Sequence, residues 1–192
     1  MTLKIKNEIT NILSMVDPIE KEALKHDIIH VFDDGGYREL LLLKMFGLKK
    51  GLGRHGDDGI DPETNKRFEL KTVNLINTSG KLRKNPGITT CHHVNHEVIK
   101  RYRQISAMVI GIFYLTKPAR IYELPTIELE SYFQRWETKL VDGKLDHLNN
   151  PKIKFKDVLE KGILHYHDPE FDQFLNGTHK SKQQDLFNPS LT

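Results

Sequence analysis

The spacing of apolar residues in the first quarter of the chain predicts helices. Apolar side chains recur at helical intervals across residues 3–16. Asp17 is a typical N-cap residue, and Pro18 is typical of the first turn of a helix. The pair predicts a second helix, which stops near 33–36. A third helix is expected over 37–46, and the glycine that follows it is typical of a helix end.

The centre of the chain carries the strand signals. Alternation across 68–73 predicts a strand with Glu69 and Lys71 on one face. Residues 107–115 form a nearly continuous apolar run, rich in β-branched and aromatic residues, which is typical of a central strand covered on both faces. The other expected elements are a helix over 96–105, a partner strand over 120–122, a helix over 126–140, and a strand, a helix and a strand over 152–166. Helices followed by mixed strands and helices indicate an α/β (α+β) fold class.

The chain has 192 residues, which favours one domain. We expect a single domain over 1–166, with a helical part over 1–47 and a mixed part over 48–166. A polar tail is expected over 167–192. The polar stretch 77–90 is expected to be a flexible or ligand-ordered loop.

Charge, cysteine content and hydropathy narrow the class of protein. The net charge of +3 excludes a protein that binds nucleic acid by electrostatic attraction alone. It is compatible with local basic patches. A single cysteine rules out an intrachain disulfide, so a reducing cytoplasm is the expected compartment. The first residues lack the apolar centre of a signal peptide, and no run approaches the roughly 18 apolar residues of a membrane span. No membrane partner is expected.

The segment from Gly56 to Asn74 carries the strongest candidate chemistry. Asp58 precedes a polar turn, and Glu69 and Lys71 follow it on one strand face. Hard cations such as Mg²⁺ bind one or two protein carboxylates together with water and phosphate oxygens. A lysine beside such a site can orient a water or offset charge on a phosphate. The pattern therefore fits metal-dependent phosphodiester hydrolysis; a solvated surface ion pair is the alternative.

A second cluster lies at residues 91–96, where one cysteine and three histidines fall within six positions. Zinc binding is one interpretation, but no second Cys/His cluster supplies the remaining ligands. Histidines can instead offer donors and acceptors to base edges in a DNA major groove. Asn149 and Asn150 would add amides of the kind that pair with adenine. Surface histidines and an Asn-Asn-Pro turn are the plain alternatives.

Basic residues gather between positions 49 and 103, around the acidic segment. This arrangement favours a phosphate backbone as partner. The candidates for phosphate contact are Lys49, Lys50, Arg83 and Lys84.

Several motifs together resemble the PvuII family of type II restriction endonucleases, over about Ile19 to Tyr166. The stretches that carry the resemblance are GRHGDDGID at 53–61, FELKTVN at 68–74, CHHVN at 91–95, YRQ at 102–104 and LNNPKI at 148–153. The resemblance implies a PD-(D/E)xK restriction-endonuclease-like core, with a mixed β-sheet flanked by helices and an N-terminal helical dimerisation region over 1–47.

The family's functional residues are carried over position by position. The resemblance implies catalytic roles for Asp58, Glu69, Lys71 and Tyr102, with Mg²⁺ held by Asp58, Glu69 and the Leu70 carbonyl. It implies DNA contacts by Asp34, His92, His93, Asn149 and Asn150. Cys91 stands where the family has a further histidine.

The function implied is Mg²⁺-dependent cleavage of both strands of double-stranded DNA at a short palindrome. A CAGCTG-like site with a blunt cut and 5′-phosphate ends is what the resemblance suggests. A homodimer and a cognate DNA methyltransferase are the implied partners. A catalytically silent sequence-specific DNA-binding protein and a repair or nicking nuclease of the same fold remain the alternatives.

Overall fold

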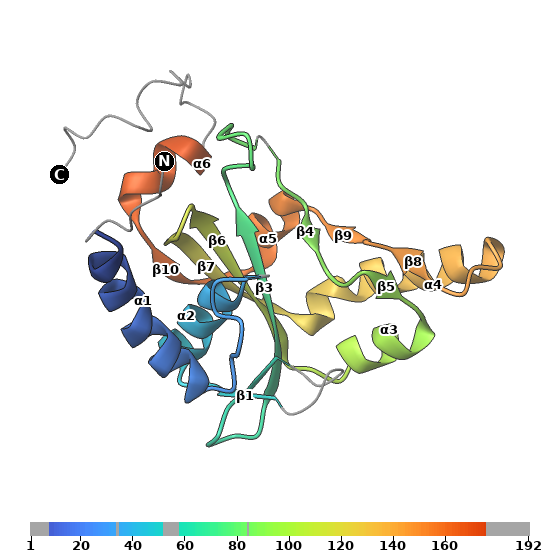
Figure 1. Cartoon of the computed structure of the whole chain (residues 1–192). Helices are drawn as coiled ribbons and strands as arrows, with labels where there is room; N and C mark the ends of the chain where they lie inside the picture. The colour runs from blue at the N-terminus through green and yellow to red at the C-terminus, as the bar shows by residue number, and fades with distance from the viewer. Residues whose placement is uncertain (1–7, 34, 52–57, 84, 176–192) are drawn as a thin grey trace, which may run out of the picture.

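A computed structural model describes residues 8–33, 35–51, 58–83 and 85–175 (Figure 1). The α-helices are α1 (Glu8–Leu24), α2 (Gly36–Phe46), α3 (His96–Tyr102), α4 (Glu130–Asp142), α5 (Phe155–Lys161) and α6 (Asp172–Leu175), with short 3₁₀ turns at η1 (Thr126–Leu129) and η2 (Pro169–Phe171). The strands are β1 (Lys49–Lys50), β2 (Gly59–Ile60), β3 (Arg67–Asn74), β4 (Ile88–Thr89), β5 (His93–Val94), β6 (Ala107–Tyr114), β7 (Lys117–Pro125), β8 (Leu148–Asn149), β9 (Lys152–Ile153) and β10 (Ile163–His167).

A six-stranded mixed sheet, in the order β1-β2-β3-β6-β7-β10, forms the centre of the molecule. β3 and β6 run parallel, whereas the other neighbouring strands in this sheet are antiparallel. The parallel pair requires a crossover between β3 and β6, and α3 lies in that connection. Two small ribbons, β4–β9 and β5–β8, lie beside the main sheet.

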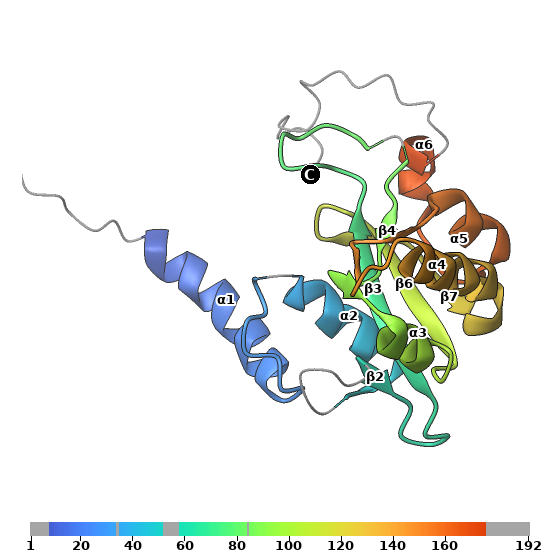
Figure 2. The ribbon, with the colours of Figure 1, turned by 90° about the vertical axis from the view of Figure 1, so that its right-hand side faces the viewer.

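Helices cover both faces of the sheet (Figure 2). α1 and α2 lie on one face, and α3, α4 and α5 lie on the other. Each face has its own apolar cluster. Val109 of β6 packs into the cluster with Leu42 and Leu43 of α2, whereas Ile110 packs into the opposite cluster. The expected central strand is confirmed, because all residues of β6 but the last are buried.

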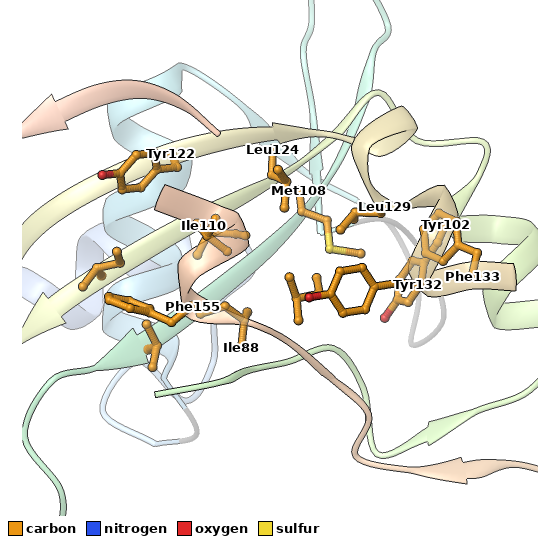
Figure 3. Close-up of a cluster of buried hydrophobic side chains, with 14 of the residues drawn as sticks. Ile88, Tyr102, Met108, Ile110, Tyr122, Leu124, Leu129, Tyr132, Phe133 and Phe155 are labelled. Atoms are coloured by element: carbon orange, nitrogen blue, oxygen red, sulfur yellow. The ribbon is translucent and has the colours of Figure 1, made fainter. Parts of the chain in front are cut away.

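The cluster on the α4 face is rich in aromatic side chains (Figure 3). Phe133 and Tyr132 of α4 reach toward Met108 on the sheet, and Tyr102 packs beside Phe133 with ring centroids 6.3 Å apart. Burial of such side chains stabilises a fold by roughly 1.5–3 kcal/mol each. This packing holds α3, which carries Tyr102, against the same face of β3 as Glu69.

The prediction of two helices divided at Pro18 is wrong, because α1 runs through the proline. A proline inside a helix costs about 3 kcal/mol. The helix continues because Ile19 and Ala23, one turn apart, both pack against the core beyond it. The predicted continuation toward Asp33 also fails. The chain leaves the helix after Leu24 and buries Ile28 and Val31 from an irregular segment.

Residues 168–175, which the sequence analysis assigned to the polar tail, have defined contacts. Phe171 is 3% exposed and stacks on Tyr114 with centroids 5.3 Å apart. Asp172 accepts a hydrogen bond from Arg120 at 2.5 Å. Apolar and ionic contacts with β6 and β7, far away in sequence, therefore hold residues 168–175.

The loop expected over 77–90 contains defined structure. The Asn77 side chain accepts hydrogen bonds from the backbone of Ser79 and Lys81, which closes a compact turn. Ile76 and Leu82 form an isolated β-bridge across it.

The predicted α+β fold class, with a mixed sheet between helices, is confirmed. Within the described ranges, no helix is both long and apolar enough to traverse a membrane.

Candidate active site

β3 places the two central candidates on one face of the sheet. Glu69 and Lys71 project toward the α3–α4 side, where their neighbours on β6 are Met108 and Ile110. Leu70, between them, packs into the opposite cluster. The alternation predicted from the sequence is confirmed.

Asp58 reaches these residues from the neighbouring strand. It directly precedes β2, which pairs antiparallel with the first residues of β3. Its Oδ2 accepts a hydrogen bond from the Leu70 backbone N–H at 2.9 Å and lies 3.8 Å from Lys71 Nζ. The next residue, Gly59, packs closely against Leu48, since a Cβ there would lie 2.9 Å from a Leu48 methyl.

A close ion pair joins the strand residues, with Lys71 Nζ 2.7 Å from Glu69 Oε1. Glu69 is only 3% exposed. Burial raises the pKa of the Glu69 carboxyl; Asp58 adds to the rise and Lys71 opposes it. Burial alone would lower the pKa of Lys71, but the two carboxylates overcome it and the net direction is upward. The site therefore holds the Lys71 ammonium close to two acidic groups.

α3 adds two side chains above Glu69. The Tyr102 hydroxyl donates to Glu69 Oε1 at 3.4 Å, and Arg101 Nη2 lies 3.6 Å from Glu69 Oε2. Burial, followed by the charge of Glu69, raises the pKa of Tyr102, so its hydroxyl keeps the proton that it donates. Sequence reasoning found Tyr102 only through the resemblance and did not find Arg101.

Both ends of α3 are fixed. The Asn95 side chain caps the first turn by accepting from the Val98 N–H at 3.0 Å. At the other end, Arg103 forms ion pairs with Glu130 at 2.7 Å and Glu137 at 2.6 Å, both on α4. The short helix is thereby held in one position over β3.

The carboxylates fit a magnesium-type cation. Within the described part of the chain, Glu69 Oε2 is buried and has no hydrogen bond, although a cation lies 3.6 Å away. Asp58, Leu70 and Lys71 line a pocket of about 240 Å³ together with Gly35, Glu39 and Thr72. Two carboxylates and a backbone carbonyl match the few protein oxygens that Mg²⁺ takes, and water and phosphate complete its shell.

The β5–β8 ribbon brings together the four candidate base-reading residues. His93 is paired in register with Asn149, and the Asn150 N–H donates to the His92 carbonyl at 2.9 Å. All four side chains are exposed. Sequence reasoning missed a fifth residue, His147, whose ring lies 4.1 Å from that of His93. No spacing rule marks a histidine two residues before an Asn-Asn pair.

The basic candidates differ in their surroundings. Lys49 is exposed on β1, whereas Lys50 is held by Glu39 at 3.2 Å. Arg83 lies beyond the end of β3, where its backbone N–H donates to the Leu75 carbonyl. Asp34 and Lys84 lie outside the described residues.

An aspartate beside a sheet strand that carries Glu-x-Lys, in a mixed sheet between helices, defines the PD-(D/E)xK class of nuclease folds. Comparison with family models gives the particular family. The model described as restriction endonuclease PvuII matches residues 4–166, and the chain belongs to that family. It is a type II site-specific deoxyribonuclease, a DNA-binding hydrolase of a restriction system that acts on double-stranded DNA. Such PD-(D/E)xK enzymes generally depend on a divalent metal.

Proposed function

We propose that the protein is a Mg²⁺-dependent endonuclease that cuts both strands of DNA at a short palindrome. The observation that carries the proposal is the cluster of Asp58, directly before β2, with Glu69 and Lys71 on β3. Lys71 Nζ lies 2.7 Å from Glu69 and 3.8 Å from Asp58. The proposed recognition site is CAGCTG-like, and the cut is blunt and leaves 5′-phosphates. The PvuII family membership supports this choice of site.

The carboxylates of Asp58 and Glu69 and the carbonyl of Leu70 would hold the cation. When bound, Mg²⁺ lowers the pKa of a coordinated water and polarises the scissile phosphate. Lys71 orients the attacking water and offsets the negative charge that develops on the phosphate. Tyr102 donates to Glu69 and keeps that carboxylate in place. Arg101 supplies a second positive charge on the same face.

His92, His93, Asn149 and Asn150 read the base edges in the major groove, and Asp34 reaches the same DNA. Lys49, Lys50, Arg83 and Lys84 contact phosphates and set the position of the duplex.

A further basic pocket of about 370 Å³ adjoins Asn149 and supports the DNA interface. Its cations are Arg135, Lys139, Lys152 and Lys154, and none of the four lies within ion-pair distance of a carboxylate in the described part of the chain. Cations without a carboxylate partner, beside candidate base-reading residues, suit a phosphate backbone.

The active form is a homodimer in which each subunit reads one half of the palindrome. Exposed apolar side chains near the N-terminal helices support this arrangement; they include Met15, Leu24, Ile29, Phe32 and Met45. A cutter of short palindromes also requires protection of the host's own sites, which fits a cognate DNA methyltransferase. The cytoplasm, where both would meet DNA, is the proposed location.

Digestion of a fully sequenced plasmid, with and without Mg²⁺, tests the proposal. Discrete fragments that share one palindrome at their ends would support it, and end sequencing would report the site and the cut position together. Plasmid left intact under every metal condition, with retained binding to one sequence, would point to a catalytically silent DNA-binding protein. Single-strand nicks alone would point to a nicking or repair nuclease.

A further inference from the structure

His147 makes two side-chain contacts with neighbouring candidate base readers. Its Nε2 lies 3.1 Å from the side-chain Oδ1 of Asn149. Its ring packs on His93 with centroids 4.1 Å apart and planes tilted by 47°. His93 and Asn149 are themselves cross-strand partners in the β5–β8 ribbon. One imidazole thus touches a residue of each strand.

The hydrogen bond fixes which way the Asn149 amide faces. A carboxamide oxygen can only accept, so His147 must donate from Nε2. With Oδ1 held by the imidazole, the NH₂ group of Asn149 is the end presented outward. Two donors at that end suit the acceptor atoms of a purine in the major groove, N7 and, on guanine, O6. An amide free to rotate could equally present its oxygen to donors such as adenine N6 or cytosine N4.

The ring contact between His147 and His93 restricts the His93 side chain on the other strand, β5. Two rings packed at this distance and tilt restrict each other's side-chain rotation. His93 is exposed on β5, a strand of two residues. Packing against His147 therefore reduces the number of orientations from which His93 meets a base.

We propose that His147 is a specificity-determining positioning residue. It holds Asn149 with its NH₂ group toward the DNA and backs the ring of His93, so that the pair favours a purine acceptor edge over a donor edge. The proposal rests on the proposed function, because it assigns His147 a part in the same base-reading face.

Three variants separate the two contacts. His147→Gln keeps a donor within reach of Asn149 but loses the ring. His147→Phe keeps the ring but loses the donor, and His147→Ala loses both. The matched control is His165→Ala on β10, because His165 also makes one hydrogen bond (to Glu123, 2.9 Å) and one ring contact (to Phe46, 5.3 Å).

The measurement is competition binding with Ca²⁺ in place of Mg²⁺, so that the DNA is not cut. Fluorescent duplexes carry the preferred palindrome or one of its symmetric single-pair changes. The readout is the affinity ratio between preferred and changed duplexes, not activity. Circular dichroism melting establishes that each variant folds.

His147→Ala is expected to lower the ratio about 10-fold for one base-pair position, at the low end of the worth of a good base contact. His147→Gln should recover most of the loss and His147→Phe only part of it. The His165→Ala ratio should equal that of the unmodified protein.

Unchanged ratios in all three variants, or an equal loss of affinity for every duplex, would overturn the role of His147 and leave the proposed function intact. An unmodified protein that prefers no duplex would overturn both.

Nuclear magnetic resonance of the free protein is a second, independent test. The Asn149 side-chain amide signals should shift in His147→Phe more than in His147→Gln.

Discussion

The ammonium of Lys71 lies 2.7 Å from Oε1 of Glu69, two residues earlier on the same strand. The Glu69 side chain is almost fully buried, and burial raises its pKa. A buried carboxylate of this kind is costly to keep ionised, so the pair is better explained by chemistry at the site than by stability.

Lys71→Ala should slow cleavage by at least ~10²-fold, because it removes the charge that would face the reacting phosphate. Binding of the DNA site should change little. Single-turnover cleavage and gel-shift titration measure the two quantities separately. Lys66→Ala, at an exposed position before β3, is the control and should cut normally. Loss of binding together with cleavage would make Lys71 a docking residue instead.

Asn150→Gly should weaken discrimination between DNA sites by about 1–3 kcal/mol while the protein remains stable. Glycine is the informative change because Asn150 has φ 47°, a left-handed conformation that alanine adopts at a cost. Asn150→Ala should therefore lower the melting temperature as well, and Asn150→Gly should not. A glycine variant that cuts the preferred and altered sites in the original ratio would show that the amide reads no base.

Arg103→Gln should lower the melting temperature at pH 7, with an effect that fades in acid. Hydrogen bonds from Arg103 hold the pKa values of Glu130 and Glu137 below their usual range. Groups with depressed folded-state pKa values stabilise the fold above the unfolded value, near ~4.3, and lose that effect as pH falls through the folded value. The wild-type and variant melting curves should thus converge below about pH 4.

Lys161→Gln is the control for the Arg103 measurement, since its ion pair with Glu128 is single, exposed and 3.6 Å long. It should change the melting temperature little at any pH.

Arg103→Gln should also slow cleavage, because the ion pairs hold the end of α3 beside Glu69. A melting difference that stayed constant from pH 7 to pH 3 would contradict the ion-pair explanation.

Lys139→Gln should weaken binding to all DNA sequences alike. If Lys139 neutralises one phosphate, the slope of log affinity against log salt should fall by about 0.9. Filter binding from low to moderate salt, with preferred and unrelated duplexes, provides both values. Lys156→Gln is the control, because Lys156 is exposed on α5 and pairs with Glu160. A change confined to one sequence would place Lys139 among the base readers.

Ile29→Glu should convert a dimer into monomers, because a charge would enter the proposed interface. Sedimentation velocity over a concentration series measures this directly. Ile127→Glu is the control: the two isoleucines are 76% and 77% exposed, but Ile127 lies in η1, away from the N-terminal part. A monomer in the unmodified protein would refute the dimer, and equal effects of both changes would refute this interface.

The sequence was sufficient for the parts that depend on local pattern. Strand alternation placed Glu69 and Lys71 on one face, and the apolar run placed β6 at the centre. The N-terminal helices were less predictable, because the proline at position 18 signals a helix start locally but is carried inside α1 by packing further along.

The contacts that complete the site depend on tertiary structure. Tyr102 meets Glu69 across 33 positions, and Arg101 reaches the same carboxylate. His147 contacts His93 only because β5 and β8 pair. No local period encodes such meetings, and only the family resemblance had pointed to Tyr102.

α3 has seven residues; it starts three residues after His93 and ends at Tyr102. So short a helix, capped at one end and held by ion pairs at the other, is a rigid connection between the segment of His93 and the site at Glu69. A shift of the segment before it would be carried to the tyrosine over Glu69. Substitutions that change the DNA sequence recognised are therefore expected to change the rate of cleavage as well, so that sequence preference and turnover evolve together.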